Sequence, residues 1–244
     1  MIMFGKVIVA LVWVVWVVVV GSTAEGTDNL SLYNPTYSTT FDRVMKRGHV
    51  ICGTNDEFPG FSQETWSQED GSHWQGFDVD LCRAVAAAVF GDAEAIEFEI
   101  VNGKTRFTYL IDGTIDVLSA ATTYTYTRNV LKKLEFMPTT YYDGQGFIVR
   151  KTLGVSSAKQ MEGARICFSE TGTAAKNIKD FFKKHFIHYI PVPVPPSRKT
   201  KEVYIKGECD MYGTDRSGLA SNRLGFEDPE WHIILPEIIS KEPL

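Results

Sequence analysis

The feature that most constrains the fold is an alternation of short strand-like and helix-like segments, which occurs twice along the chain. The first half reads strand, helix, strand, helix, strand, and the second half begins the same order again. We expect strands at 49–53, 96–100, 115–118, 165–168 and 210–212, and helices at 78–90, 107–112, 174–186 and 199–206. This alternation is typical of an α/β fold with a largely parallel sheet, in which 115–118 is a central strand.

Local signals support the expected helix at 78–90. Asp78 is a suitable N-cap, and Gly91 stands where a left-handed residue commonly ends a helix. The residues predicted to pack on the sheet share one helical face and are Leu81, Val85, Ala88 and Val89.

Two short segments match across the halves. Residues 111–117 and residues 205–211 both contain a helix end, a glycine and an aspartate that opens a strand. This repeat indicates two α/β lobes of like construction. We therefore expect lobe 1 at 41–145 and lobe 2 at 146–244, joined by a strand-like crossing segment at 141–151.

The first 24 residues differ from the rest of the chain. Lys6 is the only charged residue before Glu25, residues 7–20 are an unbroken apolar run, and residues 21–24 are small. This order predicts a cleavable secretory signal peptide at 1–24, with an uncleaved anchor as the alternative. Residues 25–40 are polar and are interpreted as a tether, so we expect a periplasmic or otherwise secreted protein.

Export makes the four cysteines candidates for disulfides. Two fall in each half, which favours the pairs Cys52–Cys82 and Cys167–Cys209, although four cysteines permit three pairings and could also be buried free thiols. No cysteine pair has the C-x-x-C spacing, which argues against a zinc site. The formal net charge of −5, without a basic cluster, argues against nucleic acid as a partner.

Ligands of open α/β sheets bind outside the carboxyl ends of the strands. Four polar or aromatic loops follow the expected strands, at 53–61, 119–128, 169–173 and 213–216. We therefore expect these loops to form a ligand-binding cleft to which both lobes contribute.

The contents of these loops suit a zwitterion. Arg128 offers a planar fork of donors for a carboxylate, and Thr123 can donate to the same oxygens. The Thr171-Gly172-Thr173 segment precedes a helix, where free amides favour an anion. Asp215 supplies a negative group for an ammonium, and Phe58 an aromatic wall. The backbone of a free amino acid carries both charges.

Each of these residues has a simpler interpretation. Arg128 could form a surface ion pair, and Asp215 or Thr173 could only cap a following turn or helix. One of Phe58 and Phe61 could be a core residue. The hypothesis of a ligand site depends on the combination, not on any single residue.

Three segments carry a resemblance to a known family. They are GFDVDLCRAVA at 76–86, YDGQGF at 142–147 and LPEIISKEPL at 235–244. From about Phe41 to its last residue the chain resembles the periplasmic solute-binding proteins for polar amino acids, in the type II fold of ABC importers, and within them the general L-amino-acid-binding branch. The resemblance implies two lobes, each a largely parallel sheet flanked by helices.

The resemblance also implies roles for particular residues. Arg128 would hold the ligand α-carboxylate, helped by Thr122, Thr123 and the amides of Gly172 and Thr173. Asp215 would hold the α-ammonium, and Phe58 would stack on the ligand. Arg106 matches a basic position in members that accept acidic side chains.

The chain also departs from that family. Ala120, Ala121, Ala174 and Ala175 stand where relatives often carry polar residues, which leaves the ligand side-chain contacts open. Relatives continue for many tens of residues beyond the position of Leu244. We therefore expect the second lobe to be incomplete at its C-terminal end.

The resemblance implies binding without chemistry. We expect an L-amino acid to bind between the lobes, to favour a closed hinge, and to be delivered by a monomer to a membrane permease, with no cofactor. One alternative is an enzyme similar to cyclohexadienyl dehydratases, for which Glu57 and Glu170 are the only His, Glu or Lys residues in the loops. Another is a membrane-anchored sensing module. A serine hydrolase is excluded by the absence of a G-x-S-x-G elbow.

Overall fold

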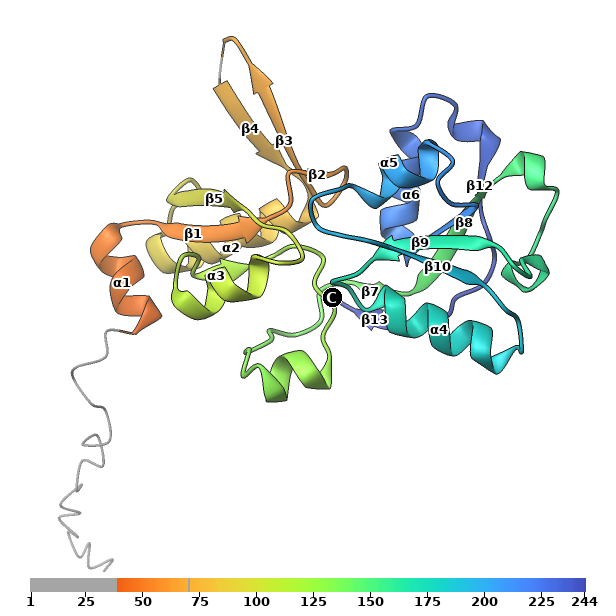
Figure 1. Ribbon diagram of the computed structural model, residues 1–244. Coiled ribbons are helices and arrows are strands. Elements are labelled where there is room, and N and C mark those ends of the chain that lie inside the picture. Colours follow the sequence, from red (N-terminus) through yellow and green to blue (C-terminus); the bar gives the residue numbers. More distant parts are fainter. Residues whose placement is uncertain (1–38, 70) are drawn as a thin grey trace, which may run out of the picture. The chain divides into compact units, whose positions relative to one another are not determined.

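A computed structural model describes residues 39–69 and 71–244, arranged mainly as helices packed on two β-sheets (Figure 1). The predicted signal peptide at 1–24, and all of the predicted tether except its last two residues, lie outside the described residues. Of the helices in the described part, none combines the length and hydropathy that are needed to span a bilayer.

The first sheet has three parallel strands in the order β5-β1-β6. β1 (Val50–Thr54) pairs with β5 (Ile96–Ile100) on one side and with β6 (Val117–Leu118) on the other. The prediction that 115–118 is a central strand was therefore wrong for the described residues. The central strand is β1, because it is the one that hydrogen-bonds on both edges.

Helices cover both faces of this sheet. α1 (Thr40–Arg47) and α2 (Phe77–Phe90) bury Val44 and Ala86 against Val50 on one face. α3 (Arg106–Asp112) packs on the other face, over a cluster that includes Ile115 and Val101. The two faces alternate along β1 because successive side chains of a strand point to opposite sides.

Helix α2 ends where the sequence predicts and begins one residue earlier, but it buries a different face. Gly91 ends it with a left-handed φ of 72°, as expected. The buried residues are Asp78, Val79, Cys82 and Ala86, whereas Val85 and Ala88 are exposed. Residues 84–90 are apolar all around the helix, so their periodicity does not select a face, and the disulfide from Cys82 to β1 does.

A three-stranded antiparallel sheet, which the sequence pattern did not predict, lies between β1 and α2 along the chain. It consists of β2 (Glu57–Phe58), β3 (Ser62–Ser67) and β4 (Gly71–Gln75). The Trp74 ring of β4 stacks on Phe98 of β5, with 5.1 Å between ring centroids. This contact ties the base of the hairpin to the first sheet.

The second sheet has five strands in the order β10-β9-β11-β8-β12. Their bounds are Ile190–Val194 for β10, Arg165–Ser169 for β9, Met211–Asp215 for β11, Gln145–Arg150 for β8 and His232–Ile234 for β12. β8 alone runs opposite to its neighbours, so the sheet is largely parallel, as predicted.

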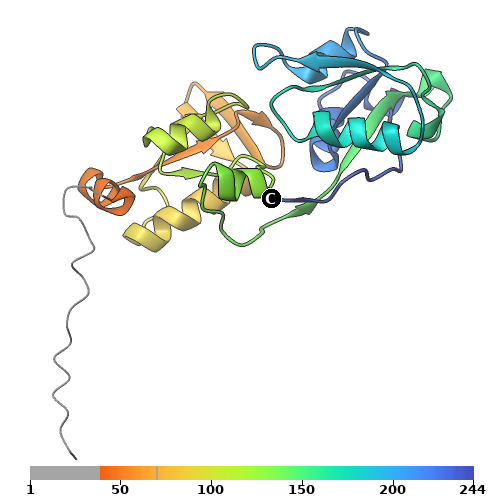
Figure 2. The same ribbon diagram turned by 60° about the horizontal axis from the view of Figure 1, so that its bottom comes forward.

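Both faces of the second sheet are buried. Helix α4 (Ala174–Lys184) covers one face, where Phe182 packs against Phe147 and Val149. Helices α5 (Thr200–Ile205) and α6 (Arg216–Leu224) cover the other, which receives Ile148. Figure 2 shows α4 and α6 on opposite sides of the strands. This arrangement leaves the ends of the strands free to carry a site.

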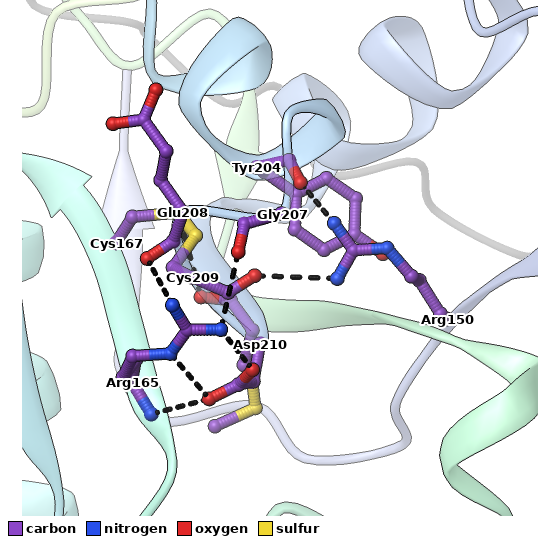
Figure 3. Close-up of polar contacts among 9 residues, drawn as sticks. Arg150, Arg165, Cys167, Tyr204, Gly207, Glu208, Cys209 and Asp210 are labelled. Carbon is purple, nitrogen blue, oxygen red and sulfur yellow. Dashed lines mark hydrogen bonds and ion pairs between the residues drawn. A yellow bond between two sulfur atoms is a disulfide. The ribbon is translucent and has the colours of Figure 1, made fainter.

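The aspartate shared by the two matching segments has the same role in both sheets. The carboxylate of Asp116 accepts a hydrogen bond from the amide of Ile51 (2.8 Å) and pairs with Arg47. The carboxylate of Asp210 accepts one from the amide of Arg165 (2.9 Å) and pairs with the guanidinium of the same residue (Figure 3). Each aspartate thus links its strand to the first strand of its half, and the internal repeat has a structural cause.

Both predicted disulfides are confirmed. Cys52–Cys82 joins β1 to α2, with the Cα atoms 6.2 Å apart. Cys167–Cys209 joins β9 to the residues just before β11, with the Cα atoms 5.7 Å apart (Figure 3). The first bridge therefore ties a helix to the first sheet, and the second ties one strand of the second sheet to the segment that leads into its neighbouring strand.

The predicted crossing strand at 141–151 is divided in two. β7 (Tyr142–Asp143) ends at Gly144, and β8 then continues into the second sheet. β7 pairs antiparallel with β13 (Glu242–Pro243), so that Glu242 lies opposite Asp143. A Cβ on Gly144 would lie 2.8 Å from the carbonyl oxygen of Ser240, so only glycine fits here. The last residues of the chain thus lie beside the crossing segment.

Candidate functional site

A cavity of about 330 Å³ opens at the carboxyl ends of β1, β6 and β11. Its lining comes from both sheets and their helices, and consists of Asn55, Asp56, Phe58, Arg106, Ala120, Ala121, Lys199, Thr200, Lys201, Tyr212, Thr214, Asp215, Gly218 and Asn222. Three of the four predicted loops contribute to it, and the loop at 169–173 does not. The volume is within the range of small-molecule sites.

The predicted site residues divide into two groups. Phe58, Arg106 and Asp215 line the cavity. The others lie outside its lining, and they are Thr122, Thr123, Arg128, Gly172 and Thr173. Of this second group, Thr122 bonds a lining residue directly, and Arg128 and Thr173 are linked to the lining by charge or hydrogen bonds, as described below.

Arg106 places a cation at the start of α3. Its Nη1 lies 3.4 Å from the Oγ1 of Thr122, and its guanidinium lies 4.7 Å from the centre of the Phe107 ring. Its Nε is buried without a hydrogen-bond partner in the structure. Burial, followed by the nearby charge of Arg128, lowers the pKa of Arg106 to about 10, against the opposing charge of Asp215. The group remains a cation at neutral pH.

Arg128 is a second cation, which lies near Arg106 but outside the lining of the cavity. It lies in the π-helical turn η2 (Thr127–Leu131) and is only 6% exposed. Its Nη1 donates to the carbonyl oxygen of Thr123 (2.6 Å), and its guanidinium lies 5.1 Å from the centre of the Phe107 ring. Burial lowers the pKa of Arg128, and the charges of Glu242 and Asp215 raise it. Interpreting Arg128 as a surface ion pair was therefore wrong.

Asp215 places an acid on the wall formed by the second sheet. It ends β11 and precedes α6, but its side chain makes no capping bond. Its Oδ1 instead accepts a hydrogen bond from the Nε2 of Gln145 (2.9 Å). The pKa of Asp215 is raised to about 7, mainly by burial and also by the charges of Glu242 and Asp143, while the hydrogen bond from Gln145 and the charge of Arg106 oppose the rise. The interpretation of Asp215 as only a helix cap was wrong.

Phe58 is held between two elements beside the cavity. Its ring stacks on Phe61 with 4.6 Å between centroids, and a Cβ on Gly218 of α6 would lie 3.7 Å from its Cζ. Neither phenylalanine is fully buried. Phe58 thus presents an aromatic surface to the cavity, while Phe61 supports it.

Thr173 does not cap α4 with its side chain, although it precedes the helix. Its hydroxyl accepts a hydrogen bond from the Nε2 of Gln145 (2.7 Å) and donates one to the carboxylate of Glu242 (3.1 Å). Gln145 and Glu242 are both 2% exposed. They were missed as candidate residues, although they stand in the segments 142–147 and 235–244 that carry the family resemblance.

Asp78 was predicted as an N-cap and instead shapes the loop after β6. Its carboxylate accepts hydrogen bonds from the hydroxyl of Ser119 (2.9 Å) and the amide of Ala121 (2.9 Å). Ala121 has a positive φ of 43°, a conformation that a non-glycine residue adopts only when its surroundings enforce it. Burial raises the pKa of Asp78 to about 6. Asp78 therefore positions two alanines, Ala120 and Ala121, that line the cavity.

The arrangement as a whole places the partly buried guanidinium of Arg106 and the carboxylates of Asp56 and Asp215 around a partly aromatic cavity, with the buried guanidinium of Arg128 close to Arg106. Within the described residues there is no group of three side chains that could hold a metal ion. The chemistry that the lining offers is the recognition of a small molecule bearing both a negative and a positive group.

Two relatives of this chain share close to half of their aligned residues with it. The general L-amino acid-binding periplasmic protein AapJ of Rhizobium johnstonii is 47% identical over 85% of this chain. The glutamate/glutamine/aspartate/asparagine-binding protein BztA of Rhodobacter capsulatus is 44% identical over 85% of this chain. The chain spans 60% of the length of each of these relatives.

A solved structure is also similar. It is an ABC transporter periplasmic binding protein from Brucella ovis with glutathione bound, which is 41% identical to this chain with a TM-score of 0.79. The match covers 85% of this chain and 64% of that one. The family described as bacterial extracellular solute-binding proteins, family 3, matches residues 50–215, from β1 to the end of β11. This chain is therefore a member of the family 3 bacterial extracellular solute-binding proteins.

Proposed function

We propose that this chain is the extracytoplasmic substrate-binding subunit of an amino-acid ABC importer. It binds a free L-amino acid in the cavity between the two sheets and delivers it to a membrane permease. The names of the relatives support this proposal, because both are amino-acid-binding proteins and AapJ is named as a periplasmic one. We also propose that the two sheets correspond to two lobes, divided near residue 145.

One observation carries the proposal: Arg106 and Asp215 line the same cavity from opposite sheets. Arg128 lies close enough to Asp215 for the carboxylate to affect its pKa. An α-amino acid carries a carboxylate and an ammonium on neighbouring atoms, so it can satisfy both signs of charge at once. A ligand with only one of these groups would leave a buried charge unpaired, at a cost of several kcal/mol.

In this proposal the basic side of the cavity takes the carboxylate. Arg128 holds the α-carboxylate, with Thr122, Thr123 and the amides of Gly172 and Thr173 as further donors. Asp215 takes the α-ammonium, because a carboxylate accepts hydrogen bonds from a cation. Phe58 covers the ligand, and Arg106 is left to contact its side chain. These assignments extend the predictions made from the sequence.

Binding is proposed to couple to movement of the lobes. Each lobe offers part of the site, so a bound ligand favours the arrangement in which both parts touch it. The closed form is then the one recognised by the permease. The chain performs no chemistry on its ligand in this proposal; Glu170, a candidate acid for the enzyme alternative, is exposed and does not line the cavity.

Isothermal titration calorimetry against the twenty L-amino acids tests the proposal. We expect at least one amino acid to bind with a stoichiometry of one. Two matched probes of the best ligand serve as controls: its N-acetyl derivative lacks the ammonium, and its decarboxylated amine lacks the carboxylate. Both should bind at least about a hundredfold more weakly, since each leaves a buried group unpaired.

The enzyme alternative is tested on the same samples. Proton NMR after prolonged incubation should recover the amino acid unchanged. Absence of binding by all twenty amino acids, or equal binding of the decarboxylated amine, would contradict the proposal.

A further inference from the structure

Glu242 is a buried carboxylate that lies beside the candidate site without lining its cavity. It is 2% exposed and stands on β13, opposite Asp143 of β7. Three side chains donate hydrogen bonds to it: Thr173 (3.1 Å), Asn177 (2.8 Å) and Ser240 (2.5 Å). A buried carboxylate with this many donors is held in one orientation.

A continuous chain of hydrogen bonds leads from Glu242 to Asp215. The hydroxyl of Thr173 donates to Glu242 and accepts from the Nε2 of Gln145. The same amide nitrogen donates its other hydrogen to Asp215. The amide oxygen of Gln145 accepts from the Nδ2 of Asn177 (2.9 Å). The members of this chain come from β13, α4, β8 and β11, which are far apart in sequence.

The direction of this chain is set at Glu242. An ionised carboxylate only accepts hydrogen bonds, so the single hydroxyl hydrogen of Thr173 must point to it. The lone pairs of that hydroxyl then face Gln145 and require the amide nitrogen there. A rotated Gln145 amide would place its oxygen against both Thr173 and Asp215, where there is no donor to meet it. Glu242, through Thr173, and Asn177, through its bond to the Gln145 oxygen, thus both favour the amide orientation in which Asp215 receives an N–H.

Glu242 also belongs to the segment that returns toward the first sheet. The carbonyl oxygen of the next residue, Pro243, accepts a hydrogen bond from the amide of Tyr124 (2.7 Å), in the loop between β6 and η2. The segment thus connects the hydrogen-bond chain at Asp215 to the loop that leads into Arg128.

We propose that Glu242 is a positioning residue for the amino-acid site, acting through Thr173 and Gln145 to hold the Asp215 carboxylate in place for the ligand ammonium. This inference rests on the proposed function. It does not make Glu242 a ligand contact, because Glu242 lies outside the lining of the cavity.

Calorimetry with L-glutamate and L-glutamine as probes tests the inference in ligand binding. We expect Glu242→Gln to weaken binding about tenfold, the value of one charge-assisted hydrogen bond. Thr173→Val should weaken it similarly, because it interrupts the same chain. The matched control is Glu230→Gln, an exposed charge that pairs only with Arg223 at 3.5 Å and should bind like the wild type.

The double variant, Glu242→Gln with Thr173→Val, distinguishes a continuous chain of hydrogen bonds from two independent effects on ligand binding. If Glu242 acts through Thr173, the double variant should bind no more weakly than the weaker single variant. Losses that add in the double variant, or wild-type affinity in Glu242→Gln, would overturn the proposal.

A second measurement needs no ligand and separates this inference from the proposed function. The titration of the Asp215 carboxyl is followed by carbon-13 NMR, with Asp215→Asn identifying the signal. Asp143, Glu242, Arg106 and Arg128 interact electrostatically with Asp215, and Asp56, Lys199 and Lys201 line the same cavity. Thr173→Val leaves all of these groups in place. The substitution removes the Thr173 hydroxyl that orients the Gln145 amide. The hydrogen bond from Gln145 lowers the pKa of Asp215, so weakening this bond should raise that pKa.

An unchanged pKa of Asp215 in Thr173→Val would overturn the proposed role of the hydrogen-bond chain. A raised pKa in a protein that binds none of the twenty amino acids would instead refute the proposed function, while the connection from Glu242 to Asp215 would stand.

Discussion

Asp215 should make amino-acid binding depend on pH near neutrality. Its pKa in the ligand-free protein is about 7, because burial and the charges of Glu242 and Asp143 outweigh the bond from Gln145 and the charge of Arg106. In the proposed binding mode the ligand ammonium binds the ionised carboxylate, so a proton on Asp215 would compete with the ligand. The ligand itself remains a zwitterion over the same range.

The size of the effect follows from the pKa. Each pH unit below about 7 removes up to about 1.4 kcal/mol, or a factor of ten in the association constant. Lowering the pH from about 8 to about 5 should therefore weaken binding about a hundredfold. Asp78, with a pKa of about 6, can add to the loss only in the lower part of this range. The interval between about pH 6 and pH 8 thus reports mainly on Asp215.

Calorimetry at several pH values and constant ionic strength measures this dependence. Repeating the titration near pH 7 in buffers of different ionisation enthalpy should show release of about half a proton per ligand, the proton displaced from Asp215. Asp215→Asn should bind weakly and without pH dependence between about pH 6 and pH 8. Affinity that is flat over that interval in the wild type, with no proton release, would refute the reasoning.

Folding of the ligand-free protein depends on the same group with the opposite sign. The pKa of Asp215 in the fold is raised above its usual value of 3.8. Its contribution to stability is therefore fully present below about 3.8 and is lost as the pH rises through about 7. A ligand that pairs with the carboxylate should offset this loss.

Three further predictions concern the site and the core. Arg128→Ala should abolish amino-acid binding, by about a hundredfold or more, while circular dichroism shows an intact fold; binding at wild-type strength would remove Arg128 from the site. Non-reducing peptide mapping should recover the 52–82 and 167–209 linkages, and a linkage between the halves would contradict this pairing. Replacing Cys167 and Cys209 by serine should lower the free energy of unfolding by up to about 4 kcal/mol in urea titrations. Phe182→Ala should cost about 3–5 kcal/mol in the same assay, because the side chain is fully buried against Phe147; a loss below about 1 kcal/mol would show that the core closes around the gap.

Local patterns in the sequence predicted many of the helices and strands and favoured the observed pairing of the cysteines. The strands at β1, β5 and β9 and the helices α2, α3 and α4 lie where apolar periodicity and glycine stops predicted them. These features depend on residues within a few positions of one another, so one sequence contains the information. The two disulfides close over 30 and 42 residues, but each lies within its own half of the chain, so the division of the cysteines between the halves favoured their pairing.

Where periodicity was ambiguous, only packing decided. Helix α2 is apolar on every side near its end, and its buried face was mispredicted. Strand β6 reads like a central strand, yet β1 holds that place because it pairs on both edges. The hairpin of β3 and β4 went unpredicted because its residues are mostly exposed and lack a clear alternation of apolar side chains.

The candidate site shows the same division. Loop composition alone singled out Arg128 and Asp215, because their charges are unusual at the ends of apolar strands. It did not single out Gln145 or Glu242, whose partners are 70 and 69 residues away in the chain. A hydrogen bond between such residues exists only after the strands are paired and water is excluded, and the same burial raises the pKa of Asp215. The sequence alone therefore determined which chemical groups are available, whereas the tertiary structure decided which of them meet and how strongly they are charged.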